Sequence, residues 1–287
     1  MENNSINAAL GEITIRSTSR FKPENGDYIG EDGLVHCGIC KKEKQFRMPV
    51  DLGGRIVDAN CDCEKKLYEA EDEARRQRER EDEINRNRQF GFPDAELRKM
   101  TFANDDGKGN RKVIRVAKNY VEKFPEMKRE GKGLLLYGTV GTGKTFAGAC
   151  IANALIEKNY RCLVTNFSRI INTLQETPFD RKQRYLDSLN NFSLIVIDDL
   201  GVERDTDYMA ENVQNIIDAR YRAGLPLIVT TNLTPDQLRA PSKLNRERTY
   251  SRLFEMCAPI AVNGNDRRKE KLESEFGKIA AILGIND

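Results

Sequence analysis

The feature that most restricts the fold of this chain is an octapeptide, Gly-Thr-Val-Gly-Thr-Gly-Lys-Thr, at residues 138–145. The apolar run 133–137 precedes it, and a helix-forming stretch, 144–158, begins within it. A match to G-x-x-x-x-G-K-[ST] between a strand and a helix predicts a phosphate-binding loop, or P-loop. A glycine-rich turn that matches by chance is the alternative, and the full match in its proper context argues against it.

The P-loop pattern predicts a site for ATP and Mg²⁺. Its glycines let the backbone turn N–H groups toward an anion, and the next helix adds its positive N-terminal end. The lysine reaches the β- and γ-phosphates, and the hydroxyl of the following threonine ligates Mg²⁺. The expected nucleotide-binding residues are Gly138, Gly141, Thr142, Gly143, Lys144 and Thr145.

Two carboxylates, Asp198 and Asp199, end the apolar run that starts at residue 194. After a P-loop, we expect Asp198 to hold Mg²⁺ through water and Asp199 to polarise the attacking water. A turn at the end of a strand is the alternative for both. Asn232 follows the next apolar run, and we expect its amide to orient the water beside the γ-phosphate. An isolated asparagine is more often a cap or turn residue.

Short apolar runs alternate with longer amphipathic stretches from about residue 132 onward. The nearly continuous runs are typical of strands covered on both faces, so the alternation predicts an α/β fold with a five-stranded parallel sheet. The expected strands are 133–137, 162–165, 194–198, 227–231 and 259–262. The expected helices are 144–158, 168–175, 181–190, 208–223 and 243–257.

One expected strand, 162–165, comes between the P-loop strand and the acidic strand. On the premise that the acidic strand lies directly beside the P-loop strand, this insertion gives the sheet order 5-1-4-3-2. Such an order indicates an ATPase with an additional strand rather than a simple nucleotide kinase.

Four of the seven cysteines form the pattern Cys37-x₂-Cys40, 20 intervening residues, then Cys61-x-Cys63. Four thiolates are the number that a closed, structural Zn²⁺ site needs. The few apolar residues here could not fold the segment alone, whereas structural zinc contributes roughly 10–16 kcal/mol in finger peptides. Replacement of one cysteine by the lone histidine, His36, and the absence of a metal are the alternatives.

A stretch of 26 residues, 64–89, carries nine acidic and eight basic side chains. This composition predicts a solvated connecting helix with many i,i+4 ion pairs, which Gly91 and Pro93 end. The expected parts of the chain are a flexible N-terminus (1–30), a zinc-binding module (31–63), a charged helical linker (64–91) and an ATPase domain (92–287).

Composition limits the remaining chemistry. The formal net charge of +2 excludes a strongly basic, histone-like protein but permits a local basic stripe. No apolar run is long enough to span a membrane and no secretory signal is visible, so we expect a cytoplasmic protein without a membrane partner. Cys150, Cys162 and Cys257 lie in apolar contexts and are expected to be core thiols.

The order and spacing of these motifs resemble those of the AAA+ helicase loaders of the DnaC, DnaI and IstB type. The resemblance covers about residues 92–270. It rests on the P-loop, the acid pair and Thr-Thr-Asn, followed by Glu247-Arg-Thr-Tyr-Ser-Arg-Leu253 and Gly264-Asn-Asp-Arg-Arg268. It implies the fold of an AAA+ P-loop ATPase.

The resemblance also implies roles for two arginines. Arg252 would be the arginine finger that completes the ATP site of a neighbouring subunit, a contact worth about 10³–10⁵ in rate, so ATP binding and homo-oligomer assembly would be coupled. An ion-paired surface arginine is the alternative. Arg268 would be sensor 2, with Arg267 as the competing choice. Some members have Glu as the second acid; because Asp199 is shorter, we expect slow hydrolysis.

Cations and aromatic side chains are interleaved between the second expected strand and the acidic strand. Such a mixture suits single-stranded nucleic acid, through phosphate attraction and base stacking. The region resembles the helical insertion that contacts single-stranded DNA in the DnaA- and DnaC-like group, and a solvated helix face is the alternative. The candidate residues are Arg169, Arg181, Lys182, Arg184, Phe167 and Tyr185.

These features predict an ATP-dependent loader that places a DnaB-type hexameric helicase on single-stranded DNA, with hydrolysis as a switch. By resemblance to loaders related to DnaI, the zinc module would dock on the helicase. One alternative is an IstB-like transposition helper, which the zinc module disfavours. Another is a nucleotide-binding adaptor without significant turnover, which the apparently complete ATP site disfavours.

Overall fold

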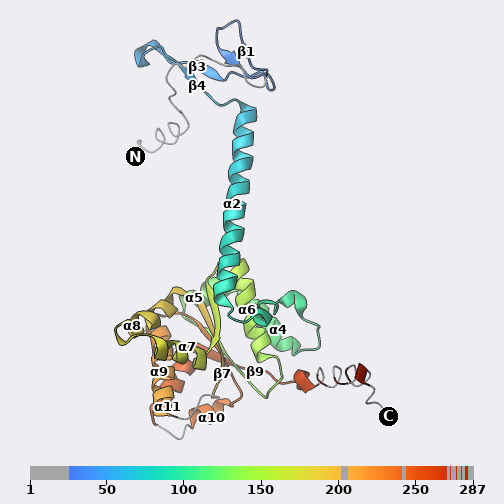
Figure 1. Cartoon of the computed structure of the whole chain (residues 1–287), viewed down its shortest axis with the longest axis vertical. Coiled ribbons are helices and arrows are strands. Elements are labelled where there is room, and N and C mark those ends of the chain that lie inside the picture. The colour runs from blue at the N-terminus through green and yellow to red at the C-terminus, as the bar shows by residue number, and fades with distance from the viewer. Residues whose placement is uncertain are drawn as a thin grey trace. The chain divides into compact units, whose positions relative to one another are not determined.

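The chain folds as two compact units, Met1–Arg80 and Glu81–Asp287, and Figure 1 colours it from the N-terminus to the C-terminus. Most of the expected flexible N-terminus lies outside the described residues, and the division between the units falls inside the helix that covers the expected linker. The computed structural model describes residues 26–201, 206–240 and 244–269, together with residues 272, 276, 279, 282 and 283.

The first unit is built around two short antiparallel hairpins and the start of α2 (Asp62–Gly91). The strand pairs are β1 (Tyr28–Ile29) with β2 (Val35–His36), and β3 (Gln45–Arg47) with β4 (Ile56–Asp58); a 3₁₀ turn, η1 (Val50–Leu52), lies between β3 and β4.

The ordered module begins earlier than residue 31. The carboxylate of Asp27 accepts hydrogen bonds from the Gly38 amide at 3.0 Å and from the Lys44 ammonium at 2.6 Å. These bonds and the Lys44 charge lower the pKa of Asp27, and burial opposes them. Residues 26–30, which the sequence analysis assigned to the flexible segment, are therefore part of the module.

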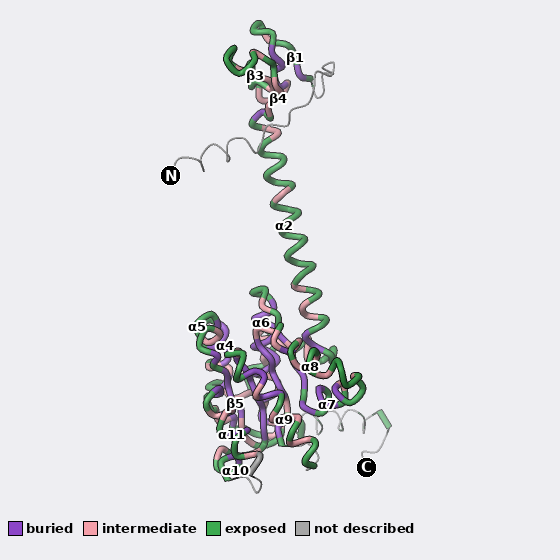
Figure 2. The backbone as a smooth tube through the Cα atoms, turned by 90° about the vertical axis from the view of Figure 1, so that its left-hand side faces the viewer, coloured by how far each residue is buried: buried purple, intermediate pink, exposed green. Residues whose placement is uncertain are grey.

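Helix α2 is charged and largely exposed, as expected for residues 64–89 (Figure 2). Asp72 forms ion pairs with Arg75 and Arg76, which lie three and four residues further along the helix. The helix ends at Gly91, where a Cβ would collide with the carbonyl oxygen of Cys162, so close packing requires a glycine at that position.

The second unit contains a five-stranded parallel sheet in the order β6-β7-β8-β5-β9. Numbered along the chain from 1 to 5, this order reads 2-3-4-1-5, which is 5-1-4-3-2 from the other edge. The strands are β5 (Gly133–Tyr137), β6 (Cys162–Asn166), β7 (Leu194–Leu200), β8 (Leu227–Thr231) and β9 (Cys257–Ala261).

One premise about the sheet is wrong. The acidic strand β7 does not lie beside the P-loop strand β5, because β8 pairs with both and separates them. The fifth strand also begins earlier than expected, since Cys257 pairs with Gly133. Apolar runs identify strands but do not fix their neighbours, which depend on contacts between residues distant in sequence.

The two faces of the sheet are covered by different helices, as Figure 1 shows. On one face Leu134 and Leu136 pack with α4, α5 and α6, whereas on the other Leu135 packs with α7, α9 and α11. This alternation explains why the runs are apolar at every position. The thiols of Cys150, Cys162 and Cys257 are buried, which confirms them as core residues.

The helices of the second unit include four that the sequence analysis did not name: α3, α4, α5 and α10. None of the helices in the described part of the chain is long and apolar enough to cross a membrane. Their bounds are α3 (Ala95–Arg98), α4 (Arg111–Glu122), α5 (Phe124–Arg129), α6 (Lys144–Glu157), α7 (Phe167–Glu176), α8 (Phe179–Ser188), α9 (Asp207–Arg222), α10 (Pro235–Arg239) and α11 (Leu244–Met256), with 3₁₀ turns η2 (Phe102–Asn104) and η3 (Leu189–Asn191).

A buried guanidinium fastens α8 and η3 to the rest of the domain. Arg220 of α9 is fully buried and donates to the carbonyl oxygens of Leu189, Phe192 and Pro226 at 3.2, 2.9 and 2.7 Å. Burial lowers the pKa of Arg220 to about 10. The side chain thereby provides hydrogen-bond donors to backbone carbonyls near the start of β7 and the start of β8.

We predict that Arg220→Met destabilises the protein by about 3 kcal/mol, because three buried carbonyls lose their donor. Arg222→Met, which changes an exposed arginine of the same helix, is the control and should change stability by less than about 0.5 kcal/mol. Urea unfolding measures both free energies. Equal stabilities of the two variants would contradict this role for Arg220.

Candidate nucleotide-binding site

The P-loop connects β5 to α6 at the carboxyl edge of the sheet. Gly143 precedes α6 with φ of 96°, a left-handed conformation that favours glycine. Gly141 has φ of 78°, and a Cβ there would collide with Asp266. The loop is therefore curled by its own glycines and covered on one side by residues that follow β9.

The Lys144 side chain is 6% exposed and lies inside the curl of the loop. Its ammonium donates to the carbonyl oxygens of Gly138 and Thr139 at 2.9 and 2.8 Å and to Asn232 Oδ1 at 2.8 Å. Burial lowers the pKa of Lys144, and the negative charges of the acid pair oppose this shift. The structure thus joins Asn232, at the end of β8, to the P-loop lysine.

The carboxylate of Asp198 lies beside the first turn of α6. Thr145 Oγ1 donates to it at 2.9 Å, and Thr230 Oγ1 donates to its Oδ1 at 2.5 Å. Burial raises the pKa of Asp198, and the two hydroxyl bonds counteract this rise. Thr145 and Asp198 are therefore positioned together as oxygen ligands of the kind that Mg²⁺ takes.

Asp199 adopts an unusual backbone conformation, with φ of 59°. The left-handed region is several-fold enriched in Asn and Asp among non-glycine residues. Some helicase loaders have Glu as the second acid. The shorter Asp at this position is consistent with the left-handed backbone. The sequence analysis did not detect the conformation, because it depends on how β7 meets β8.

The two candidate sensor arginines have different surroundings. Arg267 donates from its guanidinium to Asp106, in the loop before α4, and from its backbone amide to Gly141 O at 3.1 Å. The positive charge of Arg268 contributes to lowering the pKa of Lys144, after burial. The structure therefore brings Arg268 into the electrostatic field of the P-loop lysine, while Arg267 is committed to an ion pair.

Arg252 of α11 forms an ion pair with Asp218 of α9, and its guanidinium lies 5.7 Å from the centre of the Tyr221 ring. Its side chain remains 36% exposed. The ion pair joins Asp218 to the Nη1 atom of Arg252, and a guanidinium carries five N–H donors in a planar fork.

A cavity of about 290 Å³ lies next to the P-loop. Asn110 lines it and also donates to the Asn263 carbonyl oxygen at 2.7 Å, which ties the start of α4 to the segment after β9. Its position beside Thr142 suits the nucleoside part of a nucleotide whose phosphates contact the loop. The lining residues are Lys108, Gly109, Asn110, Thr142, Gly264, Asn265 and Arg267.

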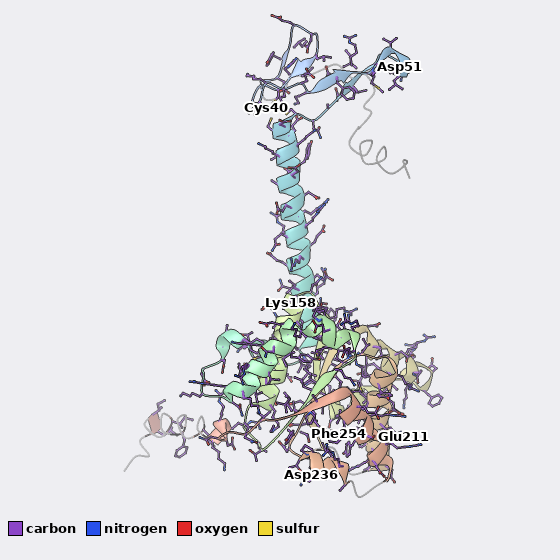
Figure 3. All side chains as sticks on the ribbon, turned by 180° about the vertical axis from the view of Figure 1, so that it is seen from behind. Cys40, Asp51, Lys158, Glu211, Asp236 and Phe254 are labelled. Atoms are coloured by element: carbon purple, nitrogen blue, oxygen red, sulfur yellow. The ribbon has the colours of Figure 1, made fainter. Side chains whose placement is uncertain are left out.

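The four cysteines of the module form one cluster at the start of α2. The sulfur atoms of Cys37, Cys40, Cys61 and Cys63 lie within 4.8 Å of one another, and Figure 3 labels Cys40 there. A tetrahedral site with Zn–S bonds of about 2.3 Å has S–S edges of about 3.8 Å, so the cluster fits such an ion. His36 is engaged elsewhere, with its Nε2 bonded to Asp32 at 3.0 Å.

Backbone amides act on the sulfur atoms of Cys37 and Cys40. The Lys42 backbone amide lowers the pKa of the Cys40 thiol to about 6, against an opposing effect of burial. The Ile39 amide donates to the Cys37 sulfur at 3.4 Å. Amides directed at sulfur stabilise thiolates, which are the form that binds zinc.

Of the expected DNA-contact residues, Arg169, Arg181 and Arg184 are exposed, whereas the two aromatic residues are not. Phe167 is 1% exposed and belongs to the core, so its expected role in base stacking is wrong. Tyr185 packs partly against the same core, and Arg169 pairs with Asp94. The pattern of aromatic and basic residues did not distinguish core aromatics from surface ones.

An aromatic residue that the sequence analysis missed lies on the surface of the same region. Phe179, the first residue of α8, is 91% exposed. It precedes Arg181, Lys182 and Arg184 on the same helix. The sequence did contain a signal for this residue. Phe179 directly follows Pro178 and begins a highly charged helix, most of whose side chains face solvent.

The sheet order, the curled loop and the acid pair define a P-loop ATPase fold of the AAA+ class. The chain belongs to the family of the IstB-like ATP binding proteins, whose pattern matches residues 60–274.

Known proteins similar to this chain include two replicative helicase loaders. DnaI of Bacillus subtilis is 30% identical over 153 residues, covering 48% of each chain. DnaC of Escherichia coli is 27% identical over 150 residues, covering 50% of this chain and 58% of DnaC. The chain therefore spans about half the length of the curated relatives that it matches.

Solved structures agree with the fold. A crystal structure of DnaI superposes with a TM-score of 0.51 at 27% identity, covering 61% of this chain and 94% of that one. The replication initiator DnaA bound to AMPPCP and single-stranded DNA gives a TM-score of 0.50 at 22% identity, covering 64% and 56%, and supports the fold alone.

Proposed function

We propose that this protein loads a DnaB-type hexameric helicase onto single-stranded DNA and uses ATP hydrolysis as a switch. The observation that carries the proposal is the pairing of Lys144 with Asn232 and of Thr145 with Asp198 at one edge of the sheet, in a chain similar to replicative helicase loaders. These residues provide a phosphate-binding cation, oxygen ligands and a water-orienting amide.

Each of these residues has a distinct task in hydrolysis. Thr145 and Asp198 would hold Mg²⁺, which neutralises phosphate charge when it is bound. Lys144 binds the β- and γ-phosphates, and Arg268 adds a second positive charge from the segment after β9. Asp199 and Asn232 orient the attacking water. Because Asp199 is short, it holds this water less closely than Glu would, and slow turnover follows.

Arg252 acts on the ATP of a neighbouring subunit. Its ion-pair partner Asp218 lies on α9, and a planar guanidinium suits the bidentate recognition of a phosphate. ATP would then lie between two protomers, so that nucleotide binding promotes assembly and hydrolysis requires it. If Arg252 were instead a surface arginine that only forms an ion pair, hydrolysis would not depend on assembly.

Arg252→Ala should leave ATP binding within about twofold of wild type and reduce the hydrolysis that rises with protein concentration by about 10³-fold. Arg248→Ala, an exposed arginine one turn earlier on α11, is the matched control. Phosphate release measured over a series of protein concentrations checks both variants. Concentration-dependent hydrolysis that persists in Arg252→Ala would refute the trans role.

The N-terminal module provides the helicase-binding surface, folded around Zn²⁺ held by Cys37, Cys40, Cys61 and Cys63. Several apolar side chains of the module are exposed to solvent. One of them is Val50 in η1, which is 91% exposed and precedes the Asp51 that Figure 3 labels. Exposed apolar groups on a small module are typical of a protein-binding surface. A zinc ion would fix the hairpins and the first turn of α2 in one arrangement.

The protein should contain one zinc ion and retain a DnaB-type hexameric helicase on an affinity resin. Cys40→Ser should lose both, because three thiolates no longer close the site. Cys150→Ala, which changes a core thiol, should lose neither. Metal analysis and the retained helicase are the two measurements.

The two measurements separate the alternatives. A zinc-free wild-type protein would refute the metal site, whereas a zinc-loaded protein that retains no helicase would refute the loader. Retention of a transposase instead would support the IstB-like helper. ATP hydrolysis that is unchanged in Lys144→Ala would indicate a nucleotide-binding adaptor.

Single-stranded DNA binds along α8 in this proposal. Phe179 offers a flat, solvent-facing ring for a base, and the neighbouring cations attract the phosphates. The buried Arg220 holds the C-terminal end of this helix in place, through the carbonyl of Leu189.

Phe179→Ala should weaken binding of a single-stranded oligonucleotide by about 1–3 kcal/mol, since one stacking platform is lost. Phe90→Ala, which removes a ring that is 77% exposed near the end of α2, serves as the control. Fluorescence anisotropy gives the affinities, and the wild-type affinity should fall steeply with salt. An affinity that is independent of salt, or equal losses in both variants, would argue against this site.

A further inference from the structure

We infer that Thr230 is a positioning residue for the acid pair, whose hydroxyl aims Asp198 and fixes the backbone of Asp199 at the same time. This inference deepens the proposed ATP hydrolysis and rests on it. The Thr-Thr-Asn sequence drew attention to Asn232, and the sequence analysis gave Thr230 no role.

The register of the sheet creates the need for such a residue. Ile197 of β7 pairs with Val229 of β8, whereas Leu200 pairs with Thr231. Two residues of β7, Asp198 and Asp199, therefore lie opposite the single residue Thr230. This arrangement is a β-bulge. Bulges re-aim side chains and are over-represented next to active sites. Here the extra residue is the second carboxylate, in its left-handed conformation.

The bulge removes ladder partners from the end of β7, and the threonine hydroxyl replaces them. Thr230 is fully buried, and its Oγ1 accepts a hydrogen bond from the Asp199 amide at 2.9 Å. The same oxygen donates its proton to Asp198 Oδ1 at 2.5 Å. A hydroxyl has one proton and two lone pairs, so Thr230 can accept from the amide and donate to the carboxylate at the same time. Each acid is thus tied to the other through one side chain.

The two hydroxyls that contact Asp198 have different tasks. Thr145 belongs to the P-loop and is itself a candidate Mg²⁺ ligand, so its bond to Asp198 is exchangeable. Thr230 belongs to β8, and its Oγ1 bonds to both acids. It would therefore keep Asp198 in place when Thr145 contributes its hydroxyl to a bound Mg²⁺. Outer partners of this kind typically change metal affinity or activity by about 10–100-fold when they are removed.

The chain supplies a matched control in the next residue. Thr231 is equally buried on the same strand, but its Oγ1 donates to the Leu200 carbonyl oxygen at 2.7 Å and accepts from the Leu233 amide at 3.1 Å. Its hydroxyl fastens the same end of β7 without touching either acid. Thr231→Val therefore reports the structural cost of losing a buried hydroxyl from this edge.

The experiment measures binding of a fluorescent ADP analogue at increasing Mg²⁺, independently of turnover. Thr230→Val should bind the analogue in EDTA within about twofold of wild type and require about 10–100-fold more Mg²⁺ for half-maximal enhancement. Thr230→Ser, which keeps the hydroxyl, should restore the wild-type Mg²⁺ dependence. Thr231→Val should lower the melting temperature and leave the Mg²⁺ dependence unchanged. Thr230→Ala replaces Thr230→Val if the latter does not fold.

Three results would overturn the inference: wild-type Mg²⁺ dependence in Thr230→Val, no recovery in Thr230→Ser, or an equal shift in Thr231→Val. Failure of the proposed function gives a different pattern. A wild-type protein that binds the analogue with Mg²⁺ but neither hydrolyses ATP nor retains a helicase refutes the loader, while the titrations still test Thr230.

Discussion

The strands β5, β7 and β8 run parallel, so their carboxyl ends meet at one edge of the sheet, and the candidate site depends on this arrangement. The edge places the P-loop lysine within hydrogen-bonding distance of Asn232, although 88 positions separate the two residues, and places Asp198 beside Thr145 and Thr230. A buried ammonium and a buried carboxylate are costly without partners. The hydroxyls and carbonyls of the edge provide these partners.

The two units solve the problem of stability by different means. The ATPase domain buries continuous apolar strands between two layers of helices, and the terminal nitrogens of its buried Arg220 donate to three carbonyl oxygens. The N-terminal module has few buried residues, and its four sulfur atoms gather where α2 begins. In the proposed loader, the first unit recognises the helicase and the second responds to nucleotide.

Sequence patterns predicted most of the sheet because each strand is a short apolar run next to a recognisable motif. Strands β5 and β8 have the expected bounds, and the charged helix is longer than expected by two residues at each end. Helices α4 and α5 were missed because no motif marks residues 92–131. The premise that the acidic strand lies beside the P-loop strand was wrong, because pairing between distant segments leaves no local trace.

The sequence by itself determined the chemistry available to this protein: a phosphate-binding loop, two adjacent carboxylates and four cysteines at metal-ligand spacing. These are local patterns, and the physical requirements of each act over a few residues. Only the tertiary structure decided how they are used. It buried Phe167 and exposed Phe179, and it placed Thr230 opposite a bulge. It also gave the adjacent residues Arg267 and Arg268 different surroundings. Such outcomes depend on which distant backbone segments pack together, because burial and register are properties of the whole fold.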